Sequence, residues 1–443
     1  MRFFDRQRRS ERAQIEDNIT PTVEMEDFVT EFHSRKHGIF FVTGEAGTGK
    51  STLLRKFYQQ EKTRAVCVAP TGIAALNISG QTIHSFFKFP PSLINPAEVK
   101  KQKDPRIYQK IDFLIIDEVS MLRPDLVDAI DVSLKMNRNC SELPFGGVTV
   151  ILFGDLYQLP PVVEDGERNI LKEMGYRTRY FFSAMAFKEN IAQVKMCRLT
   201  KVFRQHSDSF INLLNQVRNC ELTDEIGRLL DSRLIDEEDA KLTDALVLTT
   251  TNKVANAYNQ DFLDELPGNS KVFRAKVTGD FKKQEYPTEE YLELKKDAKI
   301  LFIKNDEGNR WINGSIGIVS GLDADKLLVK VGDLTHRLKQ VKWCKFRYSL
   351  AEGKIVKEEI GSFEQFPVRL GWAITIHKSQ GLTLDQIVID TRKKAFESGQ
   401  VYVALSRVRE IDAISLIGSI TGGDIWQNNE VADFEEYMNE KGF

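Results

Sequence analysis

The segment GEAGTGKS, residues 44–51, has the residue types and the spacing of a phosphate-binding loop. It follows the apolar run GIFFV and precedes a helical run, which is the setting in which such a loop forms. Its glycines let backbone N–H groups turn toward phosphates, while Lys50 would reach the β and γ oxygens and Ser51 would bind Mg²⁺. The sequence therefore predicts a nucleotide site at the following residues: Gly44, Gly47, Thr48, Gly49, Lys50, Ser51 and Thr52.

Two carboxylates and an amide follow other apolar runs. The segment IIDE places Asp117 and Glu118 after one run, and FGDLYQLPPV places Gln158 after another. Beside a nucleotide, Asp117 would bind Mg²⁺, Glu118 would accept a proton from the attacking water, and Gln158 would bond the γ-phosphate and that water. Without a nucleotide, the acids would be interpreted as helix-capping groups and Gln158 as a turn residue before two prolines.

Hydrolysis also needs positive charge beside the γ-phosphate, and an arginine supplied there can raise the rate by roughly 10³ to 10⁵. Two arginines far along the chain are candidates, Arg204 in LTKVFRQ and Arg407 in VYVALSRVR. Taken in isolation, Arg407 would be interpreted as a surface guanidinium at the end of an element. If two α/β layers face each other across a cleft, both arginines could reach a nucleotide held by the first layer.

The elements that must position these residues can be read from the hydrophobic pattern. From residue 38 onward, short β-rich apolar runs alternate with helical stretches, which predicts parallel strands with crossover helices. Runs such as FLII and VILF are apolar at consecutive positions, as expected of strands covered on both faces. A Pro- and Lys-rich segment interrupts the pattern at about 86–110. Strand candidates without helices at about 290–366 indicate a small β-barrel, inserted into a second α/β region that starts near residue 180.

Composition limits the class of protein. The chain has 443 residues, with 62 Lys and Arg against 64 Asp and Glu, so it should form two or more domains and bind nucleic acid only through local patches. Its five cysteines are scattered without a C-x-x-C pair, which argues against disulfide, zinc-finger and iron–sulfur sites and predicts a reducing compartment. No membrane span is expected, and the Arg-rich start lacks the apolar core of a secretory signal.

Polar and aromatic residues near the predicted strand ends suggest a second ligand. A protein that binds a single nucleic-acid strand needs donors for phosphates and flat faces for bases, and each stacked base contributes about 1 to 3 kcal/mol. The candidates lie in APTGIAAL, TIHSFFKF, WINGS and TIHKSQG: Thr71, Gly72, Thr82, His84, Phe86, Phe89, Asn313, Gly314, Thr375, His377 and Lys378. Burial in a core stays open as the alternative for each single Phe, for His377 and for Trp311.

The chain resembles the PIF (petite integration frequency) DNA helicases of helicase superfamily 1. It carries these segments in that family's order: GEAGTGKS, APTGIAA, TIHSFF, IIDEVSML, FGDLYQLPPV, LTKVFRQ, TIHKSQG and YVALSR. The stretch LVDAIDVSLKMNRNCSELPFGG also looks like the family's characteristic segment, and the resemblance covers roughly residues 38 to 418. It implies a motor that uses ATP and Mg²⁺, moves 5′ to 3′ on single-stranded DNA, and unwinds forks, RNA–DNA hybrids and G-quadruplexes.

The resemblance also implies roles for single residues. Lys50 matches the family's phosphate lysine, Asp117 and Glu118 its metal and base carboxylates, and Gln158 its γ-phosphate glutamine. The family's arginine fingers fall on Arg204 and Arg407. Gln380 and Gly381 match the motif that links DNA grip to nucleotide state. One departure stands out, because no clear adenine-recognition glutamine precedes residue 38 and Gln14 is a poor candidate.

The implied fold class is α/β, with two tandem RecA-like P-loop motor domains. A wedge insertion is expected in the first and an SH3-like β-barrel insertion in the second. The expected boundaries are 1–37 for an N-terminal arm and lead-in helix, 38–178 for the first motor domain with its wedge at about 86–110, 179–289 and 367–443 for the second motor domain and C-terminal tail, and 290–366 for the barrel.

The expected partners are single-stranded and forked DNA, with RNA–DNA hybrids and G-quadruplexes as further substrates. Without DNA the chain is expected to be a monomer, and no membrane is involved. Its location would be cytoplasmic in a bacterium or virus, and nuclear or mitochondrial in a eukaryote. Two other functions stay open on sequence alone: a helicase with RNA as its track, and a phosphate-loop ATPase switch that works without nucleic acid.

Overall fold

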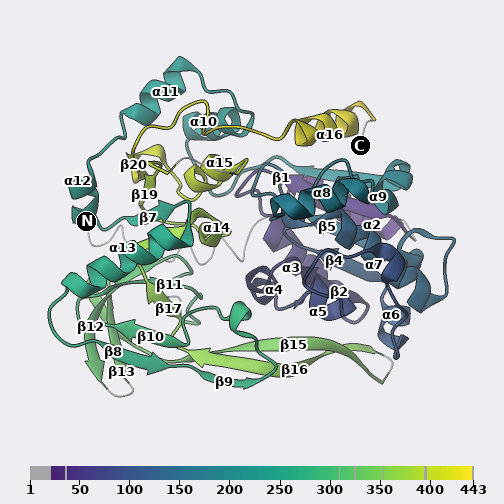
Figure 1. The fold of residues 1–443 in the computed structure, drawn as a ribbon, viewed down its shortest axis with the longest axis horizontal. Coiled ribbons are helices and arrows are strands. Elements are labelled where there is room, and N and C mark those ends of the chain that lie inside the picture. Colours follow the sequence, from purple (N-terminus) through teal and green to yellow (C-terminus); the bar gives the residue numbers. More distant parts are fainter. Residues whose placement is uncertain are drawn as a thin grey trace. The chain divides into compact units, whose positions relative to one another are not determined.

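The structure is a computed structural model that describes residues 21–34, 37–308, 310–323, 326–352, 354–393 and 397–441 (Figure 1). Its chain divides into two compact units. Among the described residues, the N-terminal unit comprises 21–202, 344–361 and 428–441, and the C-terminal unit comprises Phe203–Trp343 and Ser362–Gln427. The predicted basic arm and Gln14 lie outside the described residues.

A six-stranded sheet forms the centre of the N-terminal unit, with its strands in the order β3-β2-β4-β5-β1-β6. Its strands are β1 (Ile39–Gly44), β2 (Ala65–Ala69), β3 (Gln81–Thr82), β4 (Phe113–Ile116), β5 (Thr149–Phe153) and β6 (Val194–Leu199). All neighbouring strands pair in parallel. Every residue of β1, β2 and β5 is buried, because helices cover both faces of a doubly wound sheet. The predicted parallel α/β layer is therefore confirmed.

Helices connect these strands: α2 (Val23–Ser34), α3 (Lys50–Glu61), α4 (Gly72–Asn77), α5 (Ile83–Phe87), α6 (Arg106–Lys110), α7 (Pro124–Arg138), α8 (Asp165–Glu173) and α9 (Met185–Glu189). The predicted excursion between 86 and 110 is an irregular segment that contains the short helix α6. Polar side chains of α7 hold it: Asp125 accepts a hydrogen bond from the Ile94 amide at 2.9 Å, and Asn137 accepts one from the Gln102 amide at 2.9 Å.

A second, four-stranded parallel sheet forms the centre of the C-terminal unit, in the order β18-β7-β19-β20. Its strands are β7 (Leu246–Thr249), β18 (Ala373–Thr375), β19 (Ile387–Asp390) and β20 (Ile414–Ile417). The helices of this unit are α10 (Asp208–Arg218), α11 (Asp224–Asp231), α12 (Glu237–Leu242), α13 (Asn252–Glu265), α14 (Ile376–Ser379) and α15 (Gln400–Leu405). Two parallel α/β layers are thus present, as predicted.

The insertion into the second layer is antiparallel. Its strands are β8 (Lys271–Arg274), β9 (Lys276–Gly279), β10 (Tyr291–Leu294), β11 (Lys299–Phe302), β12 (Ile316–Asp323), β13 (Lys326–Val331), β14 (Leu334–Leu338), β15 (Val341–Ala351), β16 (Lys354–Gln365) and β17 (Val368–Leu370). A five-stranded sheet, β14-β13-β12-β11-β17, carries most of its core. Trp311 belongs to that core: it is 7% exposed and stacks on Phe302 with ring centres 4.4 Å apart.

The predicted domain boundaries need correction at four points. The first domain does not end at residue 178, because β6 completes the first sheet and the compact unit extends to Val202. The inserted strands begin at Lys271 rather than near 290, and the tip of the hairpin formed by β15 and β16 belongs to the N-terminal unit. The C-terminal helix α16 (Asn429–Glu440) also belongs to that unit, not to the second motor domain. In each case the boundary depends on packing between segments that are far apart in the sequence.

Aromatic packing explains why α16 belongs to the N-terminal unit. Phe434 stacks on Phe182 with ring centres 4.4 Å apart and planes 4° from parallel. Phe181 and Phe187 meet the same ring at 6.1 and 5.9 Å. At the next position, Glu435 accepts hydrogen bonds from the Tyr157 hydroxyl and from Arg198, each at 3.2 Å. One helical turn therefore joins the chain end to the first sheet.

Replacing Phe434 by Ala should release α16. Removing a buried phenyl ring typically costs about 3 to 5 kcal/mol. Amide hydrogen exchange of residues 429–440 measures the free energy of opening directly. The matched control is Tyr437→Ala on the same helix, because Tyr437 is 38% exposed and its loss should change that free energy by less than about 0.5 kcal/mol. Equal effects of the two substitutions would contradict this account of the packing.

Candidate functional site

The phosphate-loop segment connects β1 to α3. Gly49 precedes the helix with φ of 88°, and Gly47 has φ of 87°, backbone conformations that side-chain-bearing residues rarely adopt. A Cβ on Gly44 would lie 2.5 Å from the Leu199 carbonyl oxygen, so a larger residue has no room there. The Lys50 ammonium donates hydrogen bonds to the carbonyl oxygens of Gly44 at 2.6 Å and Glu45 at 2.8 Å. The loop is thus closed around the lysine that the sequence predicts to reach phosphate.

Strand order places the other predicted nucleotide residues at the same edge of the sheet. Strands β4, β5 and β1 are neighbours and run parallel, so their carboxyl ends coincide. Asp117 follows β4, Gln158 lies five residues past the end of β5 at Phe153, and the phosphate loop follows β1. Burial raises the pKa of Asp117 to about 6, and the positive charges of Lys50 and Arg55 act in the opposite direction. Glu118 adopts φ of 51°, which turns the chain sharply after Asp117.

Asp155 lies at the same edge, and no role for it was predicted from the sequence pattern. It is 1% exposed, accepts a hydrogen bond from the Tyr157 amide at 3.2 Å, and lies 3.4 Å from the Gln158 side-chain nitrogen. Gln158 is itself 9% exposed, and its amide donates to the Asp155 carbonyl oxygen at 3.0 Å. Asp155 therefore orients Gln158. The signal available in the sequence was a carboxylate directly after a buried strand.

The donor set at this edge fits Mg²⁺. In the part of the chain that the structure describes, no group of three or more His, Cys, Asp or Glu side chains forms a metal cage. Magnesium does not require one, because it is usually held by one or two protein oxygens together with nucleotide phosphates and water. The Asp117 carboxylate and the exposed Ser51 hydroxyl are oxygen donors of this kind.

In the C-terminal unit, the two predicted arginine fingers meet. Arg204 donates a hydrogen bond to the Ser406 carbonyl oxygen at 3.0 Å, directly beside Arg407. Gln205 reinforces the contact by donating to the carbonyl oxygens of Ser406 at 3.3 Å and Val408 at 3.0 Å. Two segments separated by about two hundred positions in the chain therefore form one arginine-bearing junction. Sequence reasoning named both residues but could not join them.

Arg407 itself is buried, so the surface interpretation of an isolated arginine is wrong. It is 1% exposed and donates to the Val403 carbonyl at 2.7 Å, the Ser406 hydroxyl at 2.7 Å and the Ser379 carbonyl at 3.3 Å. Ser379 immediately precedes Gln380 and Gly381. Arg407 is thus bonded to the residue immediately before the predicted coupling motif.

Three of the predicted DNA-contacting threonines share one local geometry. Thr82 and Thr375 end their strands, and Thr71 lies two residues after β2. Each threonine caps the start of a short helix, where its hydroxyl oxygen accepts a backbone N–H hydrogen bond, at 3.2 Å for Thr71, 3.2 Å for Thr82 and 3.3 Å for Thr375. Because the oxygen acts as an acceptor in that bond, the hydroxyl proton can be donated to a phosphate. Strands β2 and β3 pair in parallel with Ala69 opposite Thr82, so Thr71 and Thr82 lie at one edge.

The aromatic part of the predicted DNA track needs correction. Phe86 is 5% exposed and contacts Phe87 edge to face at 4.9 Å, so its face is not available for a base. Phe89 stacks on Phe87 at 5.4 Å and remains partly exposed. Burial lowers the pKa of His84, which keeps the ring neutral. Tyr108 adds to this aromatic cluster, because its ring contacts that of Phe86 and its hydroxyl donates a hydrogen bond to the Phe86 carbonyl oxygen. The aromatic rings therefore form the core of the excursion.

The remaining DNA candidates lie together in the C-terminal unit. Gly314, with φ of 95°, sits so close to the chain after Gly381 that a Cβ would be 2.9 Å from the Thr383 carbonyl oxygen. The Asn313–Gly314 turn is thereby held against Thr383 and Leu384, which follow the segment that carries the other three candidates. Burial lowers the pKa of His377, so its ring is neutral at pH 7.

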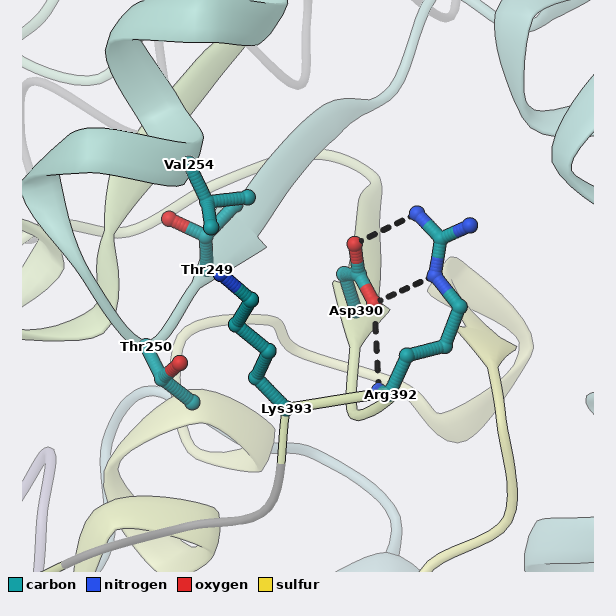
Figure 2. A pocket seen from close by; sticks show the side chains of 6 residues that line it. All are labelled: Thr249, Thr250, Val254, Asp390, Arg392 and Lys393. Atoms are coloured by element: carbon teal, nitrogen blue, oxygen red, sulfur yellow. Dashed lines mark hydrogen bonds and ion pairs between the residues drawn. The ribbon is translucent and has the colours of Figure 1, made fainter.

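A cavity of about 130 Å³ lies near the carboxyl ends of β7 and β19 (Figure 2). It is lined by Thr249, Thr250, Val254, Asp390, Arg392 and Lys393. Arg392 donates to Asp390 through Nε at 3.0 Å and Nη2 at 2.8 Å, and the Tyr258 hydroxyl is 3.2 Å from the same carboxylate. Burial opposes ionisation of Asp390, but the bonds from Arg392 prevail and lower its pKa. The carboxylate is satisfied internally, so we assign this pair a structural role at the sheet edge.

Comparison with known proteins is consistent with this arrangement. A family model described as PIF1-like helicase matches residues 23–228. The ATP-dependent DNA helicase Pif1 of Bdellovibrio bacteriovorus is 32% identical over 389 residues, which cover 85% of this chain and 84% of that protein. The chain belongs to the PIF1-like helicase family. Human PIF1 is also 32% identical, but the chain spans only 58% of its length.

Solved PIF1 structures have the same fold. Bacteroides Pif1 in complex with ADP-AlF4 superimposes with a TM-score of 0.88 at 36% identity, over 96% of this chain and 98% of that one. Bacteroides Pif1 bound to single-stranded DNA gives a TM-score of 0.69 at 35% identity, again over 96% and 98%. The predicted α/β class with two RecA-like motor domains of the PIF1 type is therefore confirmed.

The contact between Asp155 and Gln158 generates a test by double substitution. Loss of one preorganised donor at a reacting group lowers turnover by roughly 10², which is the expected effect of Gln158→Ala on ATP hydrolysis. Asp155→Ala should act in the same direction. The combined variant should be no slower than Gln158→Ala alone, because coupled residues are not additive. Asp104→Ala, which removes an exposed carboxylate, serves as the control. Additive losses would show that Asp155 does not act through Gln158.

Proposed function

We propose that this PIF1-like protein is an ATP-dependent DNA helicase that moves 5′ to 3′ along single-stranded DNA. The observation that carries the proposal is the meeting of the phosphate loop, Asp117 and Gln158 at one sheet edge. Membership of the PIF1-like helicase family supports the motor function. The structure of Bacteroides Pif1 bound to single-stranded DNA supports DNA as the polymer along which the protein moves. The 5′-to-3′ direction rests on the sequence resemblance alone.

The residues of the N-terminal unit would divide the work of hydrolysis. Lys50 moves from its carbonyl partners to the phosphates, and the loop amides bind the phosphate oxygens. Glu118 accepts the proton of the attacking water, and Gln158, oriented by Asp155, holds that water in line. When bound through Asp117 and Ser51, Mg²⁺ would neutralise charge that develops on the phosphates.

The arginine junction would report the nucleotide state. Arg407 is bonded to the Ser379 carbonyl, one residue before Gln380, and Arg204 rests on Ser406. A guanidinium drawn toward a γ-phosphate would therefore pull directly on the segment that carries Thr375, His377 and Lys378. This is a short mechanical path from phosphate to the predicted DNA contacts of the C-terminal unit.

The track would be gripped by hydroxyl groups and backbone rather than by base edges. The threonine hydroxyls at 71, 82 and 375 suit phosphates, which carry no sequence information. Forked DNA, RNA–DNA hybrids and G-quadruplexes are proposed as substrates by family resemblance, with the chain acting as a monomer in the absence of DNA. Separating each base-pair step costs on the order of 1.4 kcal/mol, well within the reach of ATP-driven stepping.

Arg407→Ala should separate nucleotide binding from turnover. Loss of a charge that acts at the γ-phosphate is expected to slow ATP hydrolysis by roughly 10³, while the dissociation constant of the nucleotide changes by less than about threefold. Steady-state hydrolysis and fluorescent-nucleotide titration measure the two quantities. Arg228→Ala, on the exposed surface of α11, is the matched control. Normal ATP turnover in Arg407→Ala would show that Arg407 does not act at the γ-phosphate.

Direction of movement is tested with two duplexes that differ only in the tail. With ATP and Mg²⁺, a DNA duplex with a 5′ single-stranded tail should be unwound, and the same duplex with a 3′ tail should remain paired. Replacing the tail with RNA tests the alternative track in the same assay. Unwinding confined to the 3′-tailed duplex would reverse the proposed polarity, and unwinding of neither would return the chain to the class of ATPase switches.

A further inference from the structure

Strand β2 leaves a gap in the backbone pairing on its β3 side. The neighbour β3 is only two residues long and pairs with Val68 and Ala69. On the other side of β2, the Val68 carbonyl accepts a hydrogen bond from the Asp117 amide at 3.0 Å, so the Cys67 amide points toward the β3 side, where the pairing of the two strands begins only at Val68. Cys67 is fully buried. An unsatisfied N–H or C=O group there would cost about 1 to 3 kcal/mol.

One tyrosine fills this gap. The Tyr348 hydroxyl accepts a hydrogen bond from the Cys67 amide at 3.0 Å and lies 3.3 Å from the Cys67 carbonyl oxygen. Strands β15 and β16 form a long hairpin (Figure 1). Tyr348 lies on β15 in the part of this hairpin that belongs to the N-terminal unit, and it is 5% exposed. Burial raises its pKa well above the ordinary value, so the hydroxyl keeps its proton and can donate. A side chain thus replaces a missing strand neighbour.

The same residue also holds β3. Its backbone amide donates to the Gln81 side-chain oxygen at 3.0 Å, and the Gln81 side-chain nitrogen donates to Ser85 at 3.1 Å. Its ring meets Phe86 edge to face at 5.8 Å. One residue of the hairpin is therefore bonded to both strands whose ends carry the predicted DNA contacts.

A lysine on the opposite strand of the hairpin completes the attachment. The Lys357 ammonium donates to the Ser79 carbonyl oxygen and lies 4.7 Å from the ring centre of Tyr58 and 5.5 Å from that of Tyr348. Ser79 immediately precedes Gly80, where a Cβ would lie 2.4 Å from the Cys67 carbonyl oxygen. The turn that leads into β3 is thereby pressed onto β2.

We propose that Tyr348 is a positioning residue for the DNA strand, which rests on the proposed function. It fixes β2 four residues before Thr71 and β3 one residue before Thr82, so that both hydroxyls are presented to one phosphate backbone. The hairpin belongs to an insertion that no nucleotide or DNA motif marks. Its contribution is to hold the phosphate-contacting ends of β2 and β3 in fixed register before DNA arrives.

Tyr348→Phe tests the proposal, because it removes one oxygen atom and keeps the ring on Phe86. The apparent dissociation constant for single-stranded DNA, measured by DNA-stimulated ATP hydrolysis, should rise about fivefold to tenfold, the value of one net hydrogen bond. Turnover at saturating DNA and the KM for ATP should stay within about twofold of the parent values, because the positioning acts on DNA affinity rather than on the chemical step. Amides of residues 65–69 and 79–82 should exchange faster in the variant without DNA, while those of β1 and β5 should not.

Two further variants make the result decisive. Tyr291→Phe removes a hydroxyl from a ring that is 55% exposed and should leave every value unchanged. Thr71→Ala should weaken DNA binding, and its effect should not add fully to that of Tyr348→Phe if the two share one path. Unchanged DNA affinity in Tyr348→Phe, or a proportional fall in turnover and affinity as from partial unfolding, would overturn the proposal. If the unaltered protein is not stimulated by DNA at all, the proposed function fails instead.

Discussion

Parallel pairing of strands is the constraint on which the rest of this molecule depends. Because neighbouring strands run in the same direction, their carboxyl ends meet at one edge, and each crossover begins there. In the N-terminal unit that edge gathers the phosphate loop, Asp117 and Gln158 from three separate strands. In the C-terminal unit it carries Thr375 and the start of α14. The strand order alone therefore brings these residues to the same edge of each sheet.

The cationic residues of the predicted nucleotide site donate hydrogen bonds to backbone carbonyl oxygens. Lys50 is held by carbonyls of its own loop, Arg204 by that of Ser406, and Arg407 by that of Ser379. These carbonyl contacts define the orientation of each of the three cationic side chains in the structure.

Much of the fold and of the nucleotide site could be predicted. The consecutive apolar residues of β4 and β5 predicted buried parallel strands, and the glycine spacing of residues 44–51 predicted the phosphate loop. Both predictions were possible because each pattern lies within a few consecutive residues. Arg204 and Arg407 could be named from their segments, but their junction at Ser406 could not. Phe86 was misjudged as a stacking face, since its burial is decided by Tyr108 and Tyr348, which lie far from it in the sequence. Asp155 was overlooked although its signal is local, because it lies just after β5 and only three residues before Gln158.

By itself, the sequence determined the order of the strands along the chain, the loop that binds phosphate and the membership of the PIF1-like family. These depend on backbone conformation and on hydrophobic periodicity, which act over a few residues. Only the tertiary structure decided where each unit ends, which rings are buried and what satisfies Cys67. These features depend on which segments pack against each other, and such segments can lie far apart in the sequence. Because β3 is only two residues long, the Cys67 amide of β2 has no partner on that strand. It donates its hydrogen bond instead to the hydroxyl of Tyr348, which lies far away in the sequence.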